Sequence, residues 1–249
     1  MTPPGSSPWL VEMASPSSTD RDEVFYAVPH AGAGAAAVRD LCRKVGRCVT
    51  AAAVRLPARE ARMHEEPLRD VHLIADAAAE AVAAHAGDRP ITLYGHCSGA
   101  IVAFEITRRL ADAKVRALFL SAHEAPDRIP RDGVWKWPVG PFMRRVAADG
   151  YVPDFVLEDE ELLELLVPAL RADYEAIETY RPAEERKIAD SIVGILGTAD
   201  TAVDQRDFEE WSRFTTGGFE LQRVPGGHNL LLDHTADVAD VITSWSRWH

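Results

Sequence analysis

The chain has 249 residues, with 27 lysines and arginines against 39 aspartates and glutamates, and its formal net charge is −12. This acidic balance excludes general binding to nucleic acid, and no apolar run reaches the ~18 residues that a membrane span requires. Three cysteines, an odd number, do not suggest a disulfide framework. Cys42 and Cys48 lack the partner residues of a zinc-ligand pattern, so we expect no metal site. We predict a soluble, cytoplasmic protein.

The first part of the chain, residues 1–20, is rich in proline and serine, and we expect a flexible leader rather than a secretory signal. Residues 21–249 are long enough for one domain with a sizeable core. Strands are predicted at 23–28, 48–54, 90–94, 117–121, 191–196 and 219–224, and helices at 36–45, 70–84, 100–110, 207–214 and 235–248. This alternation predicts the α/β class, with a mostly parallel central sheet and helices on both faces.

One region breaks the alternation. Residues 123–186 contain helical patterns but no convincing central strand. We interpret them as a helical lid inserted after a sheet strand, because inserted segments of this kind shape substrate entry. The alternative is a helical layer that only covers the sheet. Trp135, Trp137 and Phe142 make the early part of this region aromatic, and we take them as candidate substrate contacts.

The segment Gly95-His96-Cys97-Ser98-Gly99 has the frame of a nucleophile elbow with cysteine at its centre. In such an elbow, small residues flank a nucleophile that sits on a strained turn between a strand and a helix. The predicted strand before it and helix after it fit this arrangement. Ser98 is an alternative nucleophile, but it lies one place past the centre and we expect it to face away from the site.

A base and an acid follow two later strands. His228 lies in a glycine-rich loop after the last predicted strand, and Asp200 follows the strand before it. The order nucleophile, acid, base is that of an α/β-hydrolase. A neighbouring histidine can hold a cysteine as a thiolate–imidazolium pair, and the aspartate would orient the imidazole. The oxyanion would be bound by the backbone N–H groups of Ser98 and Ala31. Taken singly, each side chain could instead be an inert thiol, a structural histidine or a turn residue.

With these residues in place, the chain resembles the type II thioesterases that accompany modular polyketide and nonribosomal peptide synthases. The similarity extends from about residue 25 to 232. The matching motifs are Pro29-His30-Ala31-Gly32-Ala33-Gly34, Leu56-Pro57-Ala58-Arg59-Glu60 (Leu-Pro-Gly-Arg-Glu in the family), the elbow, Pro168-Ala169-Leu170-Arg171-Ala172-Asp173-Tyr174, Glu178-Thr179-Tyr180 and Gly226-Gly227-His228.

This resemblance implies an α/β-hydrolase fold with a mobile helical lid. It also implies antibiotic biosynthesis, with the substrate held as a thioester on the phosphopantetheine of an acyl or peptidyl carrier protein and no bound cofactor. The family's triad acid and base fall on Asp200 and His228. His30 and His96, within matching motifs, are further candidate substrate contacts.

Two positions depart from the family pattern. Cys97 stands where serine is usual, and the Gly-Asp-x-Asp turn reads Gly197-Thr198-Ala199-Asp200, so one acid is missing. An acyl-cysteine is still a thioester and keeps its reactivity toward amines and carbanions. We therefore favour hydrolytic release, with cyclisation as in the Dieckmann cyclases that resemble this pattern, or acyl transfer, as alternatives. A non-catalytic binding module is a further alternative.

Overall fold

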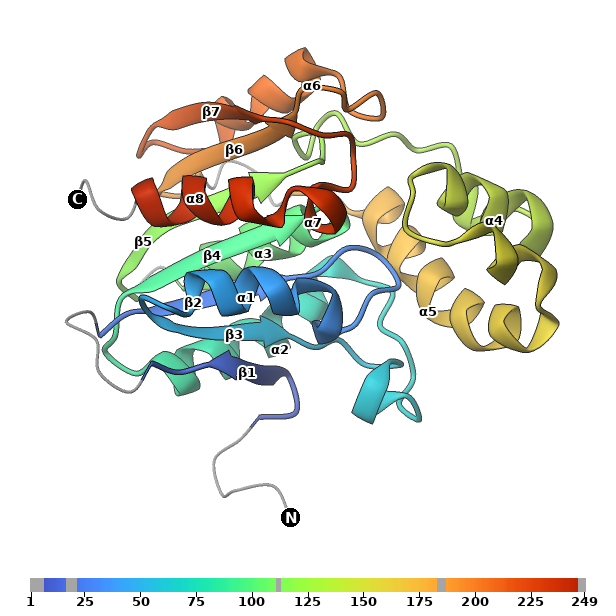
Figure 1. Ribbon diagram of the computed structural model, residues 1–249, viewed down its shortest axis with the longest axis horizontal. Helices are drawn as coiled ribbons and strands as arrows, with labels where there is room; N and C mark the ends of the chain where they lie inside the picture. The colour runs from blue at the N-terminus through green and yellow to red at the C-terminus, as the bar shows by residue number, and fades with distance from the viewer. Residues whose placement is uncertain (1–6, 17–21, 111–112, 183–186, 246–249) are drawn as a thin grey trace.

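The protein is built on one seven-stranded sheet, seen in a computed structural model that describes residues 7–16, 22–110, 113–182 and 187–245. The strands are β1 (Leu10–Ala14), β2 (Val24–Val28), β3 (Thr50–Val54), β4 (Ile91–His96), β5 (Val115–Ser121), β6 (Ser191–Gly197) and β7 (Phe219–Val224). They lie in the order β1-β3-β2-β4-β5-β6-β7 (Figure 1). Only the edge strand β1 pairs antiparallel with its neighbour, and the other pairs are parallel. The predicted mostly parallel sheet is confirmed.

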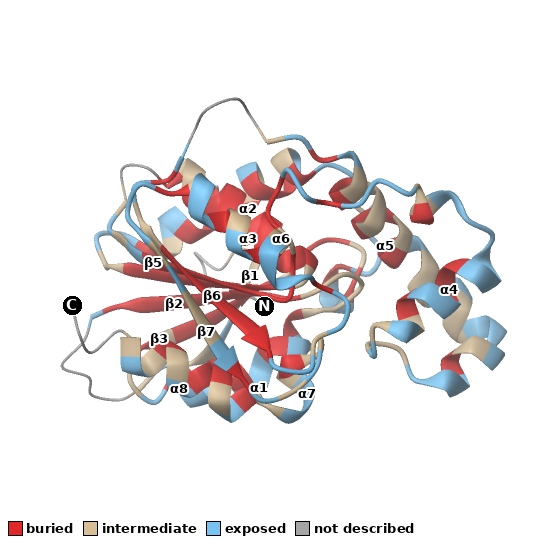
Figure 2. Ribbon diagram, turned by 90° about the horizontal axis from the view of Figure 1, so that it is seen from above, coloured by how far each residue is buried: buried red, intermediate tan, exposed pale blue. Residues whose placement is uncertain are grey.

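Helices cover both faces of this sheet (Figure 2). Helices α2 (Val71–Ala86), α3 (Ser98–Arg109) and α6 (Gln205–Glu209) lie on one face, and α1 (Arg39–Val45), α7 (Leu230–Asp233) and α8 (Thr235–Trp245) lie on the other. The position of strand β2 in the sheet explains why its sequence is apolar throughout. Its residues Val24 and Tyr26 pack into the core under α2 and α3, whereas Phe25 faces α1 and α8. A strand buried on both faces has no polar side, which favours a continuous apolar run.

The expected leader over 1–20 is wrong for residues 10–14, which form β1. Among the described residues of this segment, Leu10 packs on one apolar layer of the core and Val11 and Met13 on the other. Strand β1 pairs with β3 from Leu10 opposite Val54 to Ala14 opposite Ala51. The flanking prolines and serines dominate the composition, but five residues with apolar side chains on both faces suffice for an edge strand. Residues 1–6 and 17–20 of the expected leader, like 246–248 of the last expected helix, lie outside the described residues.

The region between β5 and β6 is helical, as the sequence predicted. It contains α4 (Val139–Ala148) and α5 (Glu160–Thr179), with short 3-10 helices η3 (Val134–Lys136) and η4 (Asp154–Glu158). Figure 1 shows α4 and α5 beyond one end of the sheet, and we call this region the lid. Phe142, Met143 and Val146 form a small apolar core inside it. A hydrogen bond connects the lid to α3: the hydroxyl of Tyr180 donates at 2.6 Å to the buried Glu105.

Ala58 adopts a left-handed backbone conformation, with φ 63°, in the loop after β3. This conformation crowds the Cβ of an L-residue, and glycine adopts it without that crowding. We therefore expect Ala58→Gly to raise the free energy of unfolding by about 0.5–1 kcal/mol, because the relief of crowding exceeds the added freedom of the unfolded chain. Urea unfolding measures the difference. An unchanged or lower midpoint would contradict the prediction.

Candidate active site

Cys97 occupies a sharp turn between β4 and α3. Its backbone has φ 51° and ψ −128°, a combination that costs an L-residue energy and recurs at functional sites. The neighbouring glycines are required by space: a Cβ on Gly95 would lie 2.2 Å from the carbonyl oxygen of Gly99, and one on Gly99 would lie 2.4 Å from that of Pro29. The N–H of Cys97 donates a 2.9 Å hydrogen bond to the carbonyl of Ser121 in β5. The turn has the geometry expected of a nucleophile elbow.

Asp200 and His228 come together because the loops after β6 and β7 pack closely. A Cβ on Gly197 would lie 2.5 Å from the carbonyl oxygen of Gly226, and the N–H of Ala199 donates a 2.8 Å hydrogen bond to the same oxygen. His228 Nδ1 then lies 3.1 Å from Asp200 Oδ2 and 3.3 Å from Oδ1. Two backbone N–H groups of the following turn also hold the Asp200 carboxylate. The carboxylate is thus fixed to orient the imidazole.

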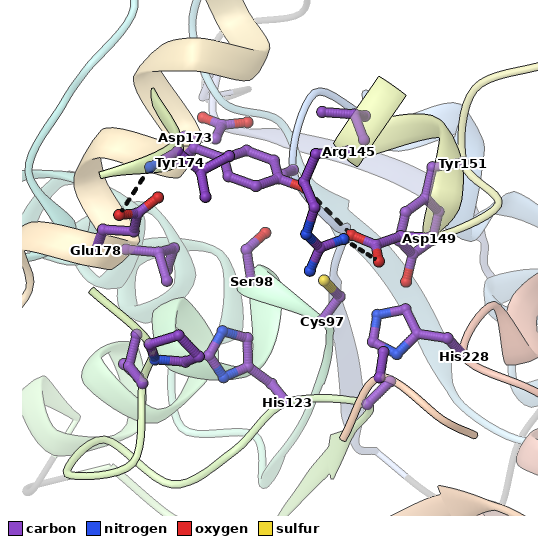
Figure 3. A pocket seen from close by; sticks show the side chains of 18 of the residues that line it. Cys97, Ser98, His123, Arg145, Asp149, Tyr151, Asp173, Tyr174, Glu178 and His228 are labelled. Atoms are coloured by element: carbon purple, nitrogen blue, oxygen red, sulfur yellow. Dashed lines mark hydrogen bonds and ion pairs between the residues drawn. The ribbon is translucent and has the colours of Figure 1, made fainter. Parts of the chain in front are cut away.

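The negative charges of Asp200 and Cys97 favour the protonated form of the His228 imidazole. Burial lowers the pKa of His228, but hydrogen bonds to Asp200 and Cys97, and the charges of both, outweigh burial and raise the pKa to about 10. Burial raises the pKa of Asp200, yet the hydrogen bond and charge of His228 bring it below its usual value. Figure 3 shows His228 beside Cys97. The arrangement favours an imidazolium next to the sulfur.

These shifts predict a pH-dependent stability. An imidazole whose pKa rises on folding from about 6.5 to about 10 stabilises the fold fully below pH 6.5, and this contribution is lost as the pH rises toward 10. Asp200→Asn removes the carboxylate charge that raises the pKa. We expect the wild type to lose more unfolding free energy between pH 6.5 and 10 than Asp200→Asn, by on the order of 1–2 kcal/mol. Urea titrations at the two pH values test this, and equal losses would contradict it.

Ala31 and Ser98 line the same cavity as Cys97. Ser98 is the first residue of α3, where backbone N–H groups have no partner within the helix and the helix dipole favours negative charge. Both positions therefore suit the oxyanion site that the sequence predicted. The Ser98 side chain also reaches the cavity, which differs from the expectation that it faces away (Figure 3). The described hydrogen bonds of the His228 ring are those to Asp200.

A buried ion pair holds the loop that carries Ala31. Asp173 Oδ2 accepts a 2.7 Å hydrogen bond from the N–H of Gly32. Arg59 donates to both oxygens of this carboxylate, at 2.8 and 3.0 Å, and to the carbonyl of Ala33 at 3.2 Å. Each of the two charged side chains is only 6% exposed. The motifs that contain Arg59 and Asp173 are distant along the chain, but the two side chains meet and position the loop that carries Ala31.

The cavity beside Cys97 has a volume of about 190 Å³ and lies between the strand ends and the lid. Apolar side chains, among them Ile129, Val134, Val146, Leu170 and Ile177, and the acidic residues Glu124, Asp132, Asp149, Asp173 and Glu178 line it. Trp135, Trp137 and Phe142 are not among the residues that line the cavity. The expectation of a substrate contact is wrong for Phe142, because its side chain packs inside the lid, and it stays a prediction for Trp135 and Trp137. Phe142 is fully buried and Trp137 is 38% exposed. Aromatic content alone could not distinguish the lid's own packing from its inner wall.

His30 and His96 lie close to Tyr151 and His228 rather than on the wall of the cavity beside Cys97. The ring of His30 stacks on Tyr151, with centroids 3.9 Å apart, and His96 Nε2 lies 3.0 Å from the Tyr151 hydroxyl. Burial lowers the pKa of His30 to about 4 and that of His96 well below its usual value. Both rings are therefore neutral. Tyr151 lies in a loop of the lid and lines the cavity, and no sequence pattern pointed to it.

No group of three His, Cys, Asp or Glu side chains within the described ranges is placed to hold a metal ion. Among the same residues, no helix is both long enough and apolar enough to cross a membrane.

Fold and site together define an α/β-hydrolase, with an elbow after β4 and a histidine–aspartate pair after the last two strands. The chain belongs to the thioesterase domain family, which it matches over residues 24–246. The resemblance to type II thioesterases is thereby confirmed.

The chain is 30% identical over 219 residues to thioesterase PikA5 of Streptomyces venezuelae, covering 87% of this chain and 78% of PikA5. It is 31% identical to the type II thioesterase BorB of the borrelidin biosynthetic cluster, whose structure superposes with a TM-score of 0.85 over 96% of this chain and 98% of BorB. It is also 35% identical over 249 residues to phenyloxazoline synthase MbtB of Mycobacterium tuberculosis, covering 97% of this chain. The chain spans only 17% of the length of MbtB.

Proposed function

We propose that the protein takes an acyl chain from the phosphopantetheine thioester of an acyl or peptidyl carrier protein onto Cys97 and releases it by hydrolysis. The carrier belongs to a synthase for polyketides or nonribosomal peptides. One observation carries the proposal: the sulfur of Cys97 shares a cavity with His228, which Asp200 orients, and with two candidate oxyanion amides. The thioesterase names of PikA5 and BorB, and the biosynthetic cluster of BorB, support the substrate class.

In the first step, the Cys97 thiolate attacks the thioester carbonyl of the substrate. The N–H groups of Ala31 and Ser98 stabilise the resulting oxyanion. The carbon–sulfur bond to pantetheine then breaks, and the imidazolium of His228 gives its proton to the departing thiolate. In the second step, neutral His228 takes a proton from water as the oxygen attacks the acyl-cysteine. Collapse of this intermediate breaks the bond to Cys97 and restores the thiolate–imidazolium pair.

The cysteine favours a second candidate function, ring closure. Transfer from pantetheine to Cys97 exchanges one thioester for another, so the acyl-enzyme keeps the electrophilicity of the substrate. A carbanion or amine within the acyl chain can then replace water as the attacking group, with His228 removing its proton. Acyl transfer to a second molecule follows the same chemistry with an external nucleophile.

Mass spectrometry of the products distinguishes these outcomes. Carrier-bound β-ketoacyl-aminoacyl and simple acyl thioesters are offered to the wild type and to Cys97→Ser. A free acid and a ring differ by one water, so each product is identified by its mass. A hydrolase yields the free acid, and its serine variant keeps appreciable hydrolysis. A ring from the wild type that is lost in the serine variant would replace hydrolysis with cyclisation, and no product from any thioester would indicate a binding module.

A further inference from the structure

Polar side chains form a continuous hydrogen-bonded line from the interior of the sheet to Tyr151, beside Cys97. The hydroxyl of Tyr94 lies 2.7 Å from Ser121 Oγ, which lies 2.7 Å from His96 Nδ1. On the other side of the ring, His96 Nε2 lies 3.0 Å from the hydroxyl of Tyr151. The Tyr151 side chain lines the same cavity as Cys97 and lies beside it (Figure 3). The line therefore joins a residue of the central strand, a residue of the elbow and a residue of the lid.

The protons in this line have only one satisfactory arrangement. The hydroxyl proton of the fully buried Tyr94 needs an acceptor, and its neighbours are Ser121 Oγ and, at 3.4 Å, His96 Nδ1. If His96 carried its proton on Nδ1, it would donate to Ser121, and only one of the two hydroxyls of Ser121 and Tyr94 could then donate to the other. The remaining hydroxyl proton would have no acceptor among the described residues, and an unpaired buried donor is costly.

In the opposite arrangement every donor has an acceptor. Tyr94 donates to Ser121, Ser121 donates to His96 Nδ1, and His96 Nε2–H donates to the oxygen of Tyr151. Burial keeps His96 neutral by lowering its pKa well below the usual value, so the ring has one proton to donate. The hydroxyl proton of Tyr151 is then free for Cys97. Burial and the charge of Cys97 raise the pKa of Tyr151, so it retains this proton.

The ring of Tyr151 is held between two histidines. It stacks on His30 with centroids 3.9 Å apart and an interplanar angle of 21°. The edge-on contact with His228 has a centroid distance of 5.7 Å and an angle of 71°. Figure 3 shows Tyr151 and His228 on the same side of Cys97. The tyrosine is thus oriented by its ring and by its oxygen.

We propose that Tyr151 is a catalytic residue whose hydroxyl donates a hydrogen bond to the Cys97 sulfur whenever that sulfur is negatively charged, and that Ser121 and His96 position it. The proposal rests on Cys97 being the nucleophile. The sulfur is charged in the resting ion pair and again when the acyl-enzyme breaks down. In that second step the C–S bond breaks, its electron pair stays on Sγ, and His228 holds the proton taken from the attacking group. A hydrogen bond to the leaving sulfur speeds this bond cleavage.

The test compares Tyr151→Phe with the wild type by alkylation. Iodoacetamide reacts with the thiolate, so its rate at Cys97, followed by peptide mass mapping across pH, reports how readily the thiolate forms. We expect the pH of half-maximal rate to rise by about one unit in Tyr151→Phe, which corresponds to a lost hydrogen bond to a charged group. The other ionisable groups around the sulfur, His228, Asp149, Arg145 and Tyr174, are the same in both proteins. Superimposable profiles would overturn the proposal.

Tyr26→Phe is the matched control, because Tyr26 also hydrogen-bonds to a histidine, His85 Nδ1 at 2.7 Å, but away from the cavity. Its alkylation profile should coincide with that of the wild type. Ser121→Ala should shift the profile in the same direction as Tyr151→Phe by a smaller amount. If Cys97 of the wild type reacts no faster than Cys48, the nucleophile itself is refuted. If Cys97 of the wild type is alkylated faster than Cys48 but the pH profile of Tyr151→Phe is not shifted, only the role of Tyr151 is refuted.

Nitrogen-15 NMR of the wild type tests the direction of the line without any substitution. We expect His96 to carry its proton on Nε2, with Nδ1 unprotonated, across the pH range in which the fold is stable. A proton on Nδ1 would reverse the line: the Tyr151 hydroxyl would donate its hydrogen bond to His96 Nε2 instead of to Cys97, which would overturn the proposal.

Discussion

Cys97→Ala is expected to lower turnover of a carrier-bound thioester by on the order of 10⁴-fold or more, and to abolish the acyl-enzyme. In the proposed mechanism the sulfur forms the bond to the acyl carbon, and alanine has no atom that can form this bond. Alanine keeps the Cβ, so the strained backbone at φ 51° and the packing of Gly95 and Gly99 are unchanged. Intact-protein mass spectrometry after mixing with acyl carrier detects the covalent adduct in the wild type and its absence in the variant.

The turnover of His228→Ala and of the double variant Cys97→Ala/His228→Ala is compared with that of Cys97→Ala. The imidazole and the sulfur act as a unit, so the double variant should be no slower than the worse single variant. Far-ultraviolet circular dichroism controls for folding. Turnover of Cys97→Ala near the wild-type rate would contradict a covalent step through Cys97. Because its hydroxyl reaches the same cavity, Ser98 would then be the residue to test.

The order of elements in the fold could be predicted because its core strands are continuous apolar runs. Such runs result from burial on both faces of a parallel sheet, and they stand out against the helical periodicity around them. Strand β1 could not be predicted in the same way. It is five residues long, includes the exposed Glu12, and is stabilised by pairing with β3, a contact between segments about 40 residues apart that no local pattern encodes.

The proximity of Cys97, Asp200 and His228 could be predicted because each of them follows a strand of a parallel sheet. The carboxyl ends of such strands meet at one edge, so Cys97, Asp200 and His228 had to come close. Tyr151 lies in a lid loop with no such constraint, and its place depends on packing against His30 and His96. Ring stacking between segments more than 50 residues apart has no signature in a single sequence. The same lack of constraint explains why the sequence could not distinguish Phe142, which packs inside the lid, from a residue of the cavity wall.

Asp173→Ala is expected to cost about 3–5 kcal/mol of unfolding free energy, because it leaves the guanidinium of Arg59 buried without its partner. Both side chains are 6% exposed, so the guanidinium is largely shielded from bulk water. The N–H of Gly32 loses its acceptor in the same substitution. Urea unfolding measures the loss. A cost below about 1 kcal/mol would show that the pair is screened like one at the surface.

Replacing both partners separates the stability of the fold from the geometry of the oxyanion loop. In Arg59→Met/Asp173→Leu no charge is buried, and most of the stability lost in Asp173→Ala should return. The loop of Ala31 still lacks the bonds to Gly32 and Ala33, so its amide is no longer held toward the carbonyl of the substrate. We expect kcat to stay about 10²-fold below that of the wild type, the effect of losing one oxyanion donor. If kcat recovers together with stability, the pair of Arg59 and Asp173 stabilises the fold but is not needed to position the loop of Ala31.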